Sequence, residues 1–511
     1  MPSLRRGLVP LLLLAVPTVS LPAQGDHAHH VEARIGRVAF PTTCRASVQS
    51  RFESAVALLH SFWYEEAAAA FEDAARGDST CSLAYWGAAM SRLHPLWTPP
   101  TPAEEAAGLA AADLAMRTSR PGTRERHYAE AIFGFFSNPG HRDFRTRIFA
   151  WESAMAAVVR QHPGDDEARI FHGLSQIAAG QLDPTDTTYH RQREAAAELT
   201  PLIPRYPDHP GLAHYVIHAF DSPALARYAL EAANHYAAIA PAVPHALHMP
   251  SHIFIRLGMW PEAIASNQHS AEAARQAEVA AGWTTVWTQR LHALDYEAYA
   301  HLQLGQDSAA RALVEQAAAV SGMRPEQDLV GYYALAAIPA RYALERDDWD
   351  AATQLRVRPA PAWRGTEAIT RFARAIGAAR RGDSTLAVAE AGELGRIEEA
   401  LRQAAGPQLY WVGQARNQRL AAEAWIDLSR GDTAAALREA RAAADTEDVT
   451  EKHPVTPGPV LPARELYADM LLQVGRPREA AAEYRATLER QPNRLRARRG
   501  LEQAQAYSVN E

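Results

Sequence analysis

Four histidines in the middle of the chain have the residue type and the spacing of metal ligands. His214 and His218 are four residues apart, and so are His248 and His252. Each member of the first pair lies 34 residues before its counterpart in the second pair. Side chains at i and i+4 of a helix share one face. Each pair could therefore hold one ion with both rings, as the paired histidines of metalloprotease helices do.

Neutral imidazole is the commonest protein ligand for zinc, copper, nickel and iron. Neighbouring helices lie about 8–10 Å apart, and a metal–nitrogen bond is about 2.0–2.1 Å long. Two pairs on neighbouring helices could therefore converge on one ion or hold two. His245, one turn before His248, and Asp221, just after the first pair, are further candidate ligands.

A third segment offers the same pattern. Counting back by equal intervals from the turn glycines of successive units places His292 where His245 lies and Asp295 where His248 lies. The residues expected to share one groove are then His214, His218, His245, His248, His252, His292 and Asp295. A mixed set of imidazoles and carboxylates favours zinc, iron or manganese over copper.

Two observations favour a simpler interpretation. A histidine in a helical bundle is often a core residue whose ring hydrogen-bonds a carbonyl or carboxylate group. In addition, Pro250 in the stretch HMPSH predicts a helix start at residues 249–251. His245 would then lie before the helix, and His248 would lie at its edge, so the i, i+4 argument is weaker for the second pair. Met249 is expected to serve packing and not to bind copper.

The 34-residue offset is the period of the tetratricopeptide repeat (TPR), a helix–turn–helix unit that stacks into a solenoid. Pro207 and Pro241 end successive units, and Pro210 and Pro244 open the next helices, where the missing proline N–H costs little. Later turns are marked by LGMWPEA, LGQDSAA, RDDWDAA, RGDSTLA, RGDTAAA and VGRPREA. With no strand alternation, the prediction is an all-α TPR superhelical solenoid of antiparallel helix pairs.

The organisation of the chain follows from these patterns. Arg5 and Arg6, an apolar run and the sequence LPAQ predict a signal peptide cleaved after Ala23. A tail with His27, His29 and His30 and an extended segment fill residues 24–43. N-terminal repeats are expected over residues 44–160, central repeats with the histidine-rich groove over 161–320, and C-terminal repeats with a polar capping helix over 321–511.

Composition limits the classes of partner and the compartment. Without Arg5 and Arg6 the chain has 50 basic and 59 acidic residues, a net charge of −9, and no basic cluster that would indicate nucleic acid. No transmembrane segment is expected after signal cleavage. The two cysteines, Cys44 and Cys81, are expected on the two helices of the first repeat and, in a periplasmic or secreted protein, to form a disulfide. Two free buried thiols are the alternative.

The stretches ALLHSFWYEEA, AYWGAAMS, IAPAVPHALHMPSHIFIRLGMW and EKHPVTPGPVLPARELYADMLL resemble a group of exported bacterial TPR proteins. The resemblance extends over nearly everything after residue 23, but the group has no firmly assigned activity. It implies that the first helices of the units line a concave groove, and the two histidine pairs match groove-facing positions.

Other features indicate less. His60 is followed by two glutamates, which are expected on a solvated helix start or a repeat turn, and a Pro-rich loop between His453 and Glu465 could be a lid over the groove or a plain linker. The sequence contains no G-x-S-x-G motif, no HExxH motif and no phosphate-binding glycine loop. It therefore indicates no enzyme class.

Two functions follow from the sequence. The first is an exported solenoid whose groove holds a transition metal, with a structural or a catalytic role. The alternative is a scaffold that binds an envelope protein or peptide in the groove, with the histidines as polar contacts and without a metal.

Overall fold

The structure, a computed structural model, describes residues 34–137, 140, 142–183, 185–358, 363–404 and 409–509. The predicted signal peptide and the histidines at 27, 29 and 30 lie outside these ranges. About 73% of the described residues are helical, which confirms the predicted all-α TPR solenoid. A search of the described helices for one long and apolar enough to cross a membrane finds none.

The first half of the chain is a succession of helices that pack in pairs. They are α2 (Ala46–His60), α3 (Tyr64–Gly77), α4 (Ser82–Met90), α5 (Pro102–Thr118), α6 (Arg124–Phe136), α7 (Phe144–Gln161), α8 (Asp166–Gln181), α9 (His190–Leu199), α10 (Pro210–Phe220), α11 (Leu230–Ile239), α12 (Pro244–His248) and α13 (Pro250–Arg256). Short 3-10 helices, η1 (Thr200–Leu202) and η2 (Ala226–Ala229), lie on either side of α10.

The second half continues the pattern. Its helices are α14 (Trp260–Ala280), α15 (Thr288–Gln303), α16 (Asp307–Ala318), α17 (Leu329–Leu344), α18 (Trp349–Thr353), α19 (Arg364–Arg381), α20 (Ser384–Gln403), α21 (Leu409–Ser429), α22 (Thr433–Asp448), α23 (Ala463–Gln473), α24 (Pro477–Arg490) and α25 (Leu495–Val509). Two short strands, β1 (Val286–Trp287) and β2 (Met323–Arg324), pair in parallel. They are a small exception to the expectation of no strands.

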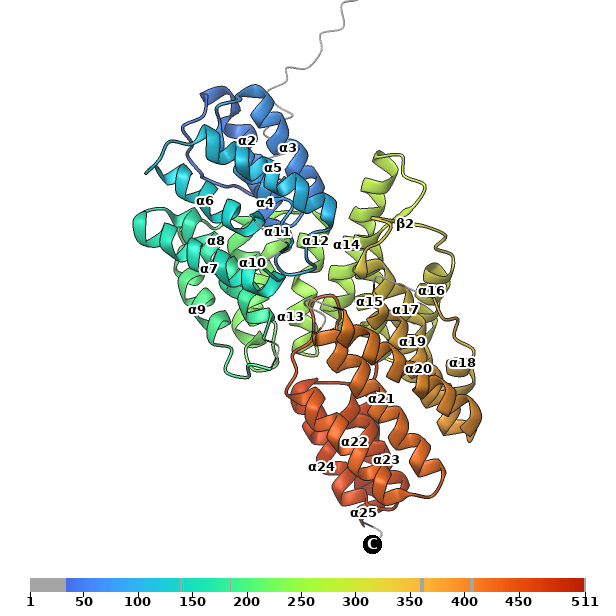
Figure 1. Cartoon of the computed structure of the whole chain (residues 1–511). Helices are drawn as coiled ribbons and strands as arrows, with labels where there is room; N and C mark the ends of the chain where they lie inside the picture. The colour runs from blue at the N-terminus through green and yellow to red at the C-terminus, as the bar shows by residue number, and fades with distance from the viewer. Residues whose placement is uncertain are drawn as a thin grey trace, which may run out of the picture.

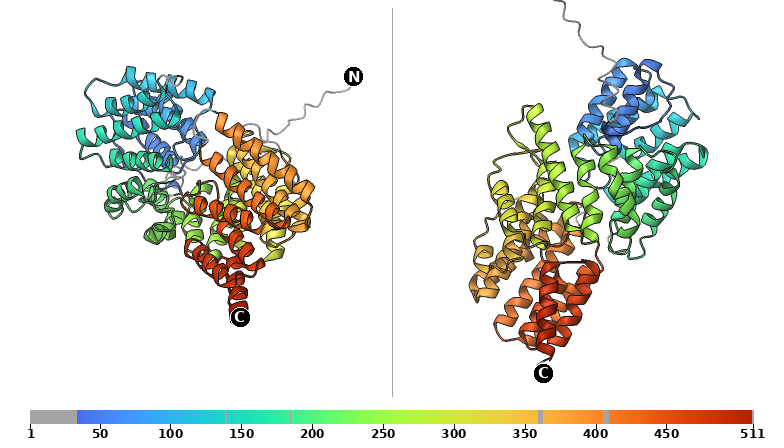
Figure 2. Two further views of the ribbon diagram at one scale, coloured as in Figure 1. Left: turned by 60° about the horizontal axis from the view of Figure 1, so that its bottom comes forward. Right: turned by 180° about the vertical axis from the view of Figure 1, so that it is seen from behind.

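Each helix packs on the next, and many alternate helices, such as α15, α17, α19 and α21, also pack on one another, which is how repeats stack into a solenoid. Figures 1 and 2 show the helices from α2 to α11 as one body and those from α14 to α25 as another, with α12 and α13 between them. One buried core extends from Ile35 to Ala300 and a second from Leu329 to Ala504. The two histidine pairs lie where these bodies meet.

Left-handed residues mark the turns between repeats, as the sequence predicts. The backbone φ is positive at Gly258, Gly305, Asp347, Gly382, Gly431 and Gly475. Gly258 also permits a close approach: a Cβ atom there would lie 2.3 Å from the carbonyl oxygen of Pro492. A side chain at this turn is therefore excluded both by the backbone conformation and by contact with the C-terminal region.

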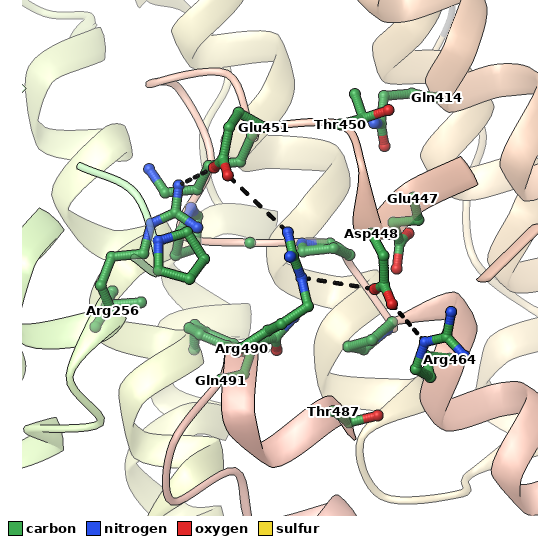
Figure 3. A pocket seen from close by; sticks show the side chains of 18 of the residues that line it. Arg256, Gln414, Glu447, Asp448, Thr450, Glu451, Arg464, Thr487, Arg490 and Gln491 are labelled. Atoms are coloured by element: carbon green, nitrogen blue, oxygen red, sulfur yellow. Dashed lines mark hydrogen bonds and ion pairs between the residues drawn. The ribbon is translucent and has the colours of Figure 1, made fainter. Parts of the chain in front are cut away.

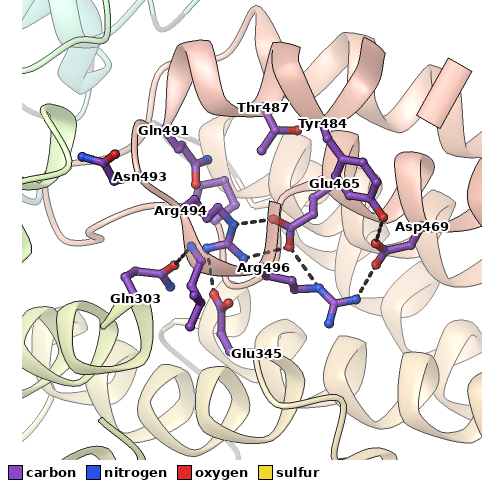
Figure 4. Close-up of polar contacts among 12 residues, drawn as sticks. Gln303, Glu345, Glu465, Asp469, Tyr484, Thr487, Gln491, Asn493, Arg494 and Arg496 are labelled. Atoms are coloured by element: carbon purple, nitrogen blue, oxygen red, sulfur yellow. Dashed lines mark hydrogen bonds and ion pairs between the residues drawn. The ribbon is translucent and has the colours of Figure 1, made fainter. Parts of the chain in front are cut away.

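The C-terminal helix is fixed by a buried network of charges (Figure 4). Arg494, with no exposed surface, pairs with Glu465 at 2.7 Å and with Glu345 at 2.8 Å. Arg496 adds an ion pair to Glu465 at 3.1 Å. Next to this network, Asn493 donates to the carbonyl oxygen of Gly258 at 3.2 Å. The end of the solenoid is thereby attached to its central turn.

The predicted disulfide between Cys44 and Cys81 is present, with the two Cα atoms 4.8 Å apart. Its position differs from the prediction. Cys44 precedes α2, and Cys81 is the residue immediately before α4. The bond therefore joins the starts of two helices, because α3 ends at Gly77 and the chain turns back before Cys81.

Replacing both cysteines by serine is expected to lower the free energy of unfolding by about 2–4 kcal/mol, because the cross-link restricts a long loop of the unfolded chain. The two positions are 37 residues apart. Urea unfolding of the variant and of the wild type, with and without reductant, measures the difference. The reduced wild type should match the variant, and equal stability of all the samples would contradict the prediction.

Candidate metal centre

Six histidines from four helices gather where the two bodies meet. They form two groups of three, and within each group the candidate ligand atoms lie within 4.8 Å of one another. The cleft triad is His214 and His218 of α10 with His245 of α12. The inner triad is His248 of α12, His252 of α13 and His292 of α15. The two sequence pairs thus do not share one point, and each triad draws on two adjacent units of the solenoid.

A helix, α13, begins at Pro250 as the sequence predicts, but the residues before it are also helical. Met249 has the helical dihedrals φ −53° and ψ −36°, so α12 runs on into α13. His245 and His248 therefore lie on a helix and not on a loop. Because proline fixes φ near the helical value, Pro250 is compatible with this continuation. His248 keeps the i, i+4 relation to His252, and their ring centroids are 5.0 Å apart.

The inner triad contains a contact that two neutral imidazoles cannot make by themselves. Nδ1 of His252 lies 2.8 Å from the carboxylate of Asp221 and therefore carries the proton. Nδ1 of His248 lies 2.7 Å from Oδ1 of Asn267. The amide nitrogen of Asn267 donates to the Ala263 carbonyl at 2.7 Å, so Oδ1 accepts and His248 also carries its proton on Nδ1.

Both Nε2 atoms of this pair therefore present lone pairs to each other, and they are only 3.0 Å apart. A cation between them removes the repulsion. Two nitrogens bound at about 2.0–2.1 Å to one ion, with tetrahedral or octahedral angles, are about 2.9–3.4 Å apart. The separation of the His248 and His252 nitrogens thus matches that of two ligands of one metal ion.

A proton shared by the Nε2 atoms of His248 and His252 would be less favourable here than a metal ion. His248 and His252 are each 1% exposed, and burial lowers the pKa of both. Burial also holds the pKa of His292 well below its ordinary value, and the neighbouring charges of His252 and Lys452 add to the effect. The rings are neutral at physiological pH, and neutral imidazole is the form that binds metals.

Hydrogen bonds also orient the ring nitrogens of the cleft triad, but fewer such bonds hold them. Nδ1 of His214 donates to the carbonyl oxygen of His60 at 2.6 Å, which turns the His214 Nε2 lone pair toward Nε2 of His245, 3.2 Å away. Burial lowers the pKa of His214 to about 3. Both ring nitrogens of His218 are buried without a hydrogen-bond partner within the described ranges. Such a ring lacks the partners that buried polar groups normally have, and an ion would supply one.

Asp221 holds the inner triad from outside and does not belong to it. Its carboxylate accepts from His252, from Lys452 at 2.7 Å and from Arg256 at 2.9 Å. Burial alone would raise its pKa, but the charges of Lys452 and Arg256 outweigh burial and hold the pKa well below the ordinary value. A carboxylate on the far nitrogen of a ligating histidine is a common support of metal sites.

The ion pairs continue beyond Asp221 into the C-terminal body. Figure 3 shows Arg256, Glu451, Arg490, Asp448 and Arg464 in a row across a small pocket. The pocket has a volume of about 60 Å³, which leaves room for a few waters only. This row ties α13 to the C-terminal helices and thereby fixes the position of the inner triad.

Asp295 also lies outside the two triads, although the sequence predicts it as a ligand. It faces the fully buried Arg341 of α17, with Oδ1 3.3 Å from Nε. Burial raises the pKa of Asp295 to about 6 against the opposing charge of Arg341. The predicted alignment holds for both residues: His292 faces the preceding unit as His245 does, and Asp295 faces the next unit as His248 does, where its partner is Arg341 and not a histidine.

A third group of possible ligands, His60, Glu167 and His209, is joined by its own hydrogen bonds, and within the described residues only Nδ1 of His209 is left buried without a partner. Glu167 accepts from His60 at 3.1 Å and from His209 at 2.8 Å. Despite its burial, these partners lower the pKa of Glu167 to about 2. Nδ1 of His60 then faces the hydroxyl of Tyr215 at 2.9 Å. The group supports the cleft triad, since the carbonyl oxygen of His60 is the partner of His214.

The Pro-rich segment 451–462, which we call the strap, folds into the groove and is not a free linker. The hydroxyl of Tyr296 lies 2.9 Å from the carbonyl oxygens of Pro454 and Thr456. Arg341 donates to Thr456 at 3.0 Å and to the carbonyl oxygen of Gly458 at 2.8 Å. The strap thus occupies the faces of α15 and α17 that a groove-binding peptide would need.

A cleft of about 610 Å³ between the two bodies reaches the wall of the cleft triad at His218. Asp221 and the strap residues Lys452 and His453 also line it. Its aromatic lining comes from both bodies and consists of Trp97, Phe144, Tyr189, Trp363, Tyr410 and Trp411. A space of this size is typical of small-molecule sites.

Several of these residues could not be found from the sequence. Asn267 lies 19 residues after His248, and Lys452 lies 231 residues after Asp221. Neither has a motif that points to the histidines. The one available signal was the repeat alignment, which does identify His292.

An Asp221→Asn variant is expected to bind zinc about 10–100-fold more weakly at the inner triad, because the His252 ring loses its charged acceptor. The number of zinc ions bound should not change. Competition with a chromophoric chelator measures the affinity, and the exposed Asp208→Asn provides a matched control. An unchanged affinity would show that Asp221 does not support a ligand.

No protein-family model and no curated protein sequence matches the chain. Among solved structures it is similar to the APC/C hetero-tetramer Cut9–Hcn1, with 12% identity and a TM-score of 0.35 over 94% of this chain and 80% of that one. It is also similar to yeast Tom70, with 8% identity and a TM-score of 0.33 over 91% of this chain and 89% of that one. Similarity at this level transfers no function.

Proposed function

We propose that the chain is an exported metal-binding protein in which the two histidine triads each hold a transition-metal ion. The inner triad is the stronger site. The observation that carries the proposal is the 3.0 Å contact between the Nε2 atoms of His248 and His252, whose Nδ1 protons are both engaged elsewhere. The disulfide supports an oxidising compartment, periplasmic or secreted.

Zinc is the metal that fits the triads best. With the carboxylates of Asp221 and Asp295 engaged in ion pairs, each triad offers three imidazoles, and the reason to favour manganese disappears. Three histidines with a fourth position open is the arrangement of catalytic zinc sites, in which a bound water is activated. A role in hydrolysis or hydration is therefore part of the proposal for the triad beside the cleft.

The alternative, a scaffold that binds an envelope peptide in the groove, has less support. The strap fills the faces of α15 and α17, and Arg341 and Tyr296 are already satisfied by its carbonyl groups. A peptide would have to displace these contacts. An envelope partner that binds outside the groove is compatible with the metal proposal.

The test is elemental analysis of the mature protein, purified without a histidine tag, after dialysis against zinc and then against zinc-free buffer. We expect two equivalents of zinc, or one if only the inner triad retains its ion. A protein that retains none and takes up none in a calorimetric titration would contradict the proposal. The exposed His235→Ala is the matched control and should bind as the wild type does.

A further inference from the structure

The three residues His60, Glu167 and His209, which we call the Glu167 group, contain a buried carboxylate without a basic partner. Glu167 is 4% exposed, and within the described ranges its hydrogen-bond partners are the two histidines. Burial alone would raise the pKa of Glu167, but the histidines lower it to about 2, so the carboxylate is charged at neutral pH. A charged carboxylate is rarely buried unless a cation pairs with it or it binds a metal ion.

The two acidic residues that precede Glu167 have the partners that it lacks. Asp165 lies 3.3 Å from a guanidinium nitrogen of Arg124, and Asp166 lies 2.9 Å from one of Arg205. Among the residues that the structure describes, no lysine or arginine pairs with Glu167, and its ion-pair partners are imidazoles only. The most buried of the three consecutive carboxylates is therefore the one without a permanent positive charge beside it.

A proton on one of the two histidines would supply that charge, but both rings disfavour it. Burial lowers the pKa of His60 to about 4, against the hydrogen bond and the charge of Glu167, so this ring is neutral at neutral pH. A charged His209 would carry a second N–H on Nδ1, which is buried without a partner in the described part of the chain. A metal ion on Nε2 leaves the ring neutral, and an unpaired neutral donor costs less than a charged one.

Three helices bring the ligand atoms together. His60 is the last residue of α2, Glu167 lies in the first turn of α8, and His209 immediately precedes α10. One ligand atom from each lies within 4.8 Å of the others. The two Nε2 atoms lie 3.1 Å and 2.8 Å from the carboxylate oxygens, close to the separation of about 2.9–3.4 Å between two ligands of one ion. The hydroxyl of Tyr215, 2.9 Å from Nδ1 of His60, can accept its proton while Nε2 binds the ion.

We propose that the Glu167 group is a third metal site, built from two histidines and one carboxylate, which accepts manganese(II) or iron(II) more readily than the triads do. A carboxylate oxygen favours these harder ions, and the ligand set is the one found in many non-haem iron sites. Glu167 and His209 also line a cleft of about 630 Å³, from which water or a substrate can reach the ion. The site shares no ligand with the triads, so the inference does not depend on the proposed function.

The third site should be weaker than the triads, because an ion must displace the two hydrogen bonds within the Glu167 group. We therefore expect it to empty during a dialysis that leaves zinc in the triads. The experiment titrates the dialysed, zinc-loaded full chain with manganese(II) and measures free manganese by electron paramagnetic resonance. One manganese ion should bind per chain, both in the wild type and in the His214→Ala/His248→Ala variant, in which both triads are disabled. No binding at up to about 1 mM manganese would overturn the inference.

Two variants test the ligands. Glu167→Gln should weaken manganese binding at least about tenfold, because the amide lacks the negative charge. His209→Asn should do the same, and asparagine is favoured at the position before a helix, so α10 should still form. Glu198→Gln is the matched control, since this carboxylate accepts from a single histidine, His172, at 2.6 Å. Unchanged manganese affinity in either ligand variant would overturn the inference.

Zinc content measured on the same samples separates the two proposals. A chain that retains zinc but binds no manganese refutes the third site and leaves the triads as metal sites. A chain that retains no zinc but binds one manganese ion, with the loss in Glu167→Gln, supports the third site and contradicts the proposed function.

Discussion

A His248→Ala variant is expected to lose the zinc ion of the inner triad while keeping that of the cleft triad. In the wild type, the Nε2 atom of His248 lies 3.0 Å from that of His252, and a hydrogen bond to Asn267 holds the His248 ring. Removing a ligand should cost more than removing a group that merely supports one, which is worth about 10–100-fold in affinity. We therefore expect a loss of more than about 100-fold, measured as the zinc content after dialysis and by chelator competition.

The cleft triad gives the complementary result. His245→Ala should lose the other ion and keep that of the inner triad, and the double variant His214→Ala/His248→Ala should lose both. Zinc should also raise the thermal midpoint of the wild type, since a ligand that binds only the folded state stabilises it by about 4 kcal/mol at 1,000 times its Kd. Variants that retain full zinc content and the full increase in midpoint would contradict this assignment.

An Arg494→Met variant is expected to lower the free energy of unfolding by about 3–5 kcal/mol. Arg494 and Glu465 have no exposed surface, and the substitution leaves the carboxylate of Glu465 with Arg496 as its remaining partner. Burial already raises the pKa of Glu465 against the opposing charges of Arg494 and Arg496. Urea unfolding measures the loss, which should also loosen the contact between Asn493 and the turn at Gly258.

A matched comparison isolates the buried charge. The exposed Arg499→Met should have little effect on stability. The double variant Arg494→Met/Glu465→Met should lose less stability than the sum of the single variants, because it leaves neither charge without its partner. An Arg494→Met protein as stable as the wild type would show that the network does not hold the C-terminal helix.

The repeat and its turns could be predicted from the sequence because both depend on local chemistry. Pro210 and Pro244 begin α10 and α12 as expected, and the glycine of LGMW takes the left-handed conformation. The i, i+4 spacing of His214 and His218 also survives, with ring centroids 4.8 Å apart. These features need only the geometry of a single helix or turn.

The division into two triads could not be predicted, because it depends on how neighbouring helices face each other. His245 and His248 are three residues apart, which separates their directions by about 60° around the helix. His245 consequently faces His214 of the preceding unit, whereas His248 faces His292 of the following one. A rule based only on the i, i+4 spacing within each pair therefore cannot predict that His245 and His248 face different units.

The residues that orient the triads could not be predicted from the sequence either. The sequence predicts Asp221 as a ligand because it follows the first histidine pair, but Lys452 and Arg256 reach it from the strap and from α13. An acidic residue with two buried cations beside it is already neutralised, and its remaining role is to orient His252. The partner of Asp221 on the strap becomes visible only when the chain has folded back over the groove.

Anomalous diffraction at the zinc edge from crystals of the zinc-loaded protein tests the central claim most directly. We expect a peak bound by Nε2 of His248, Nε2 of His252 and a nitrogen of His292, at about 2.0–2.1 Å from each. A second peak should lie within the cleft triad. The absence of a peak in the inner triad, with the Nε2 atoms of His248 and His252 still in contact, would contradict it.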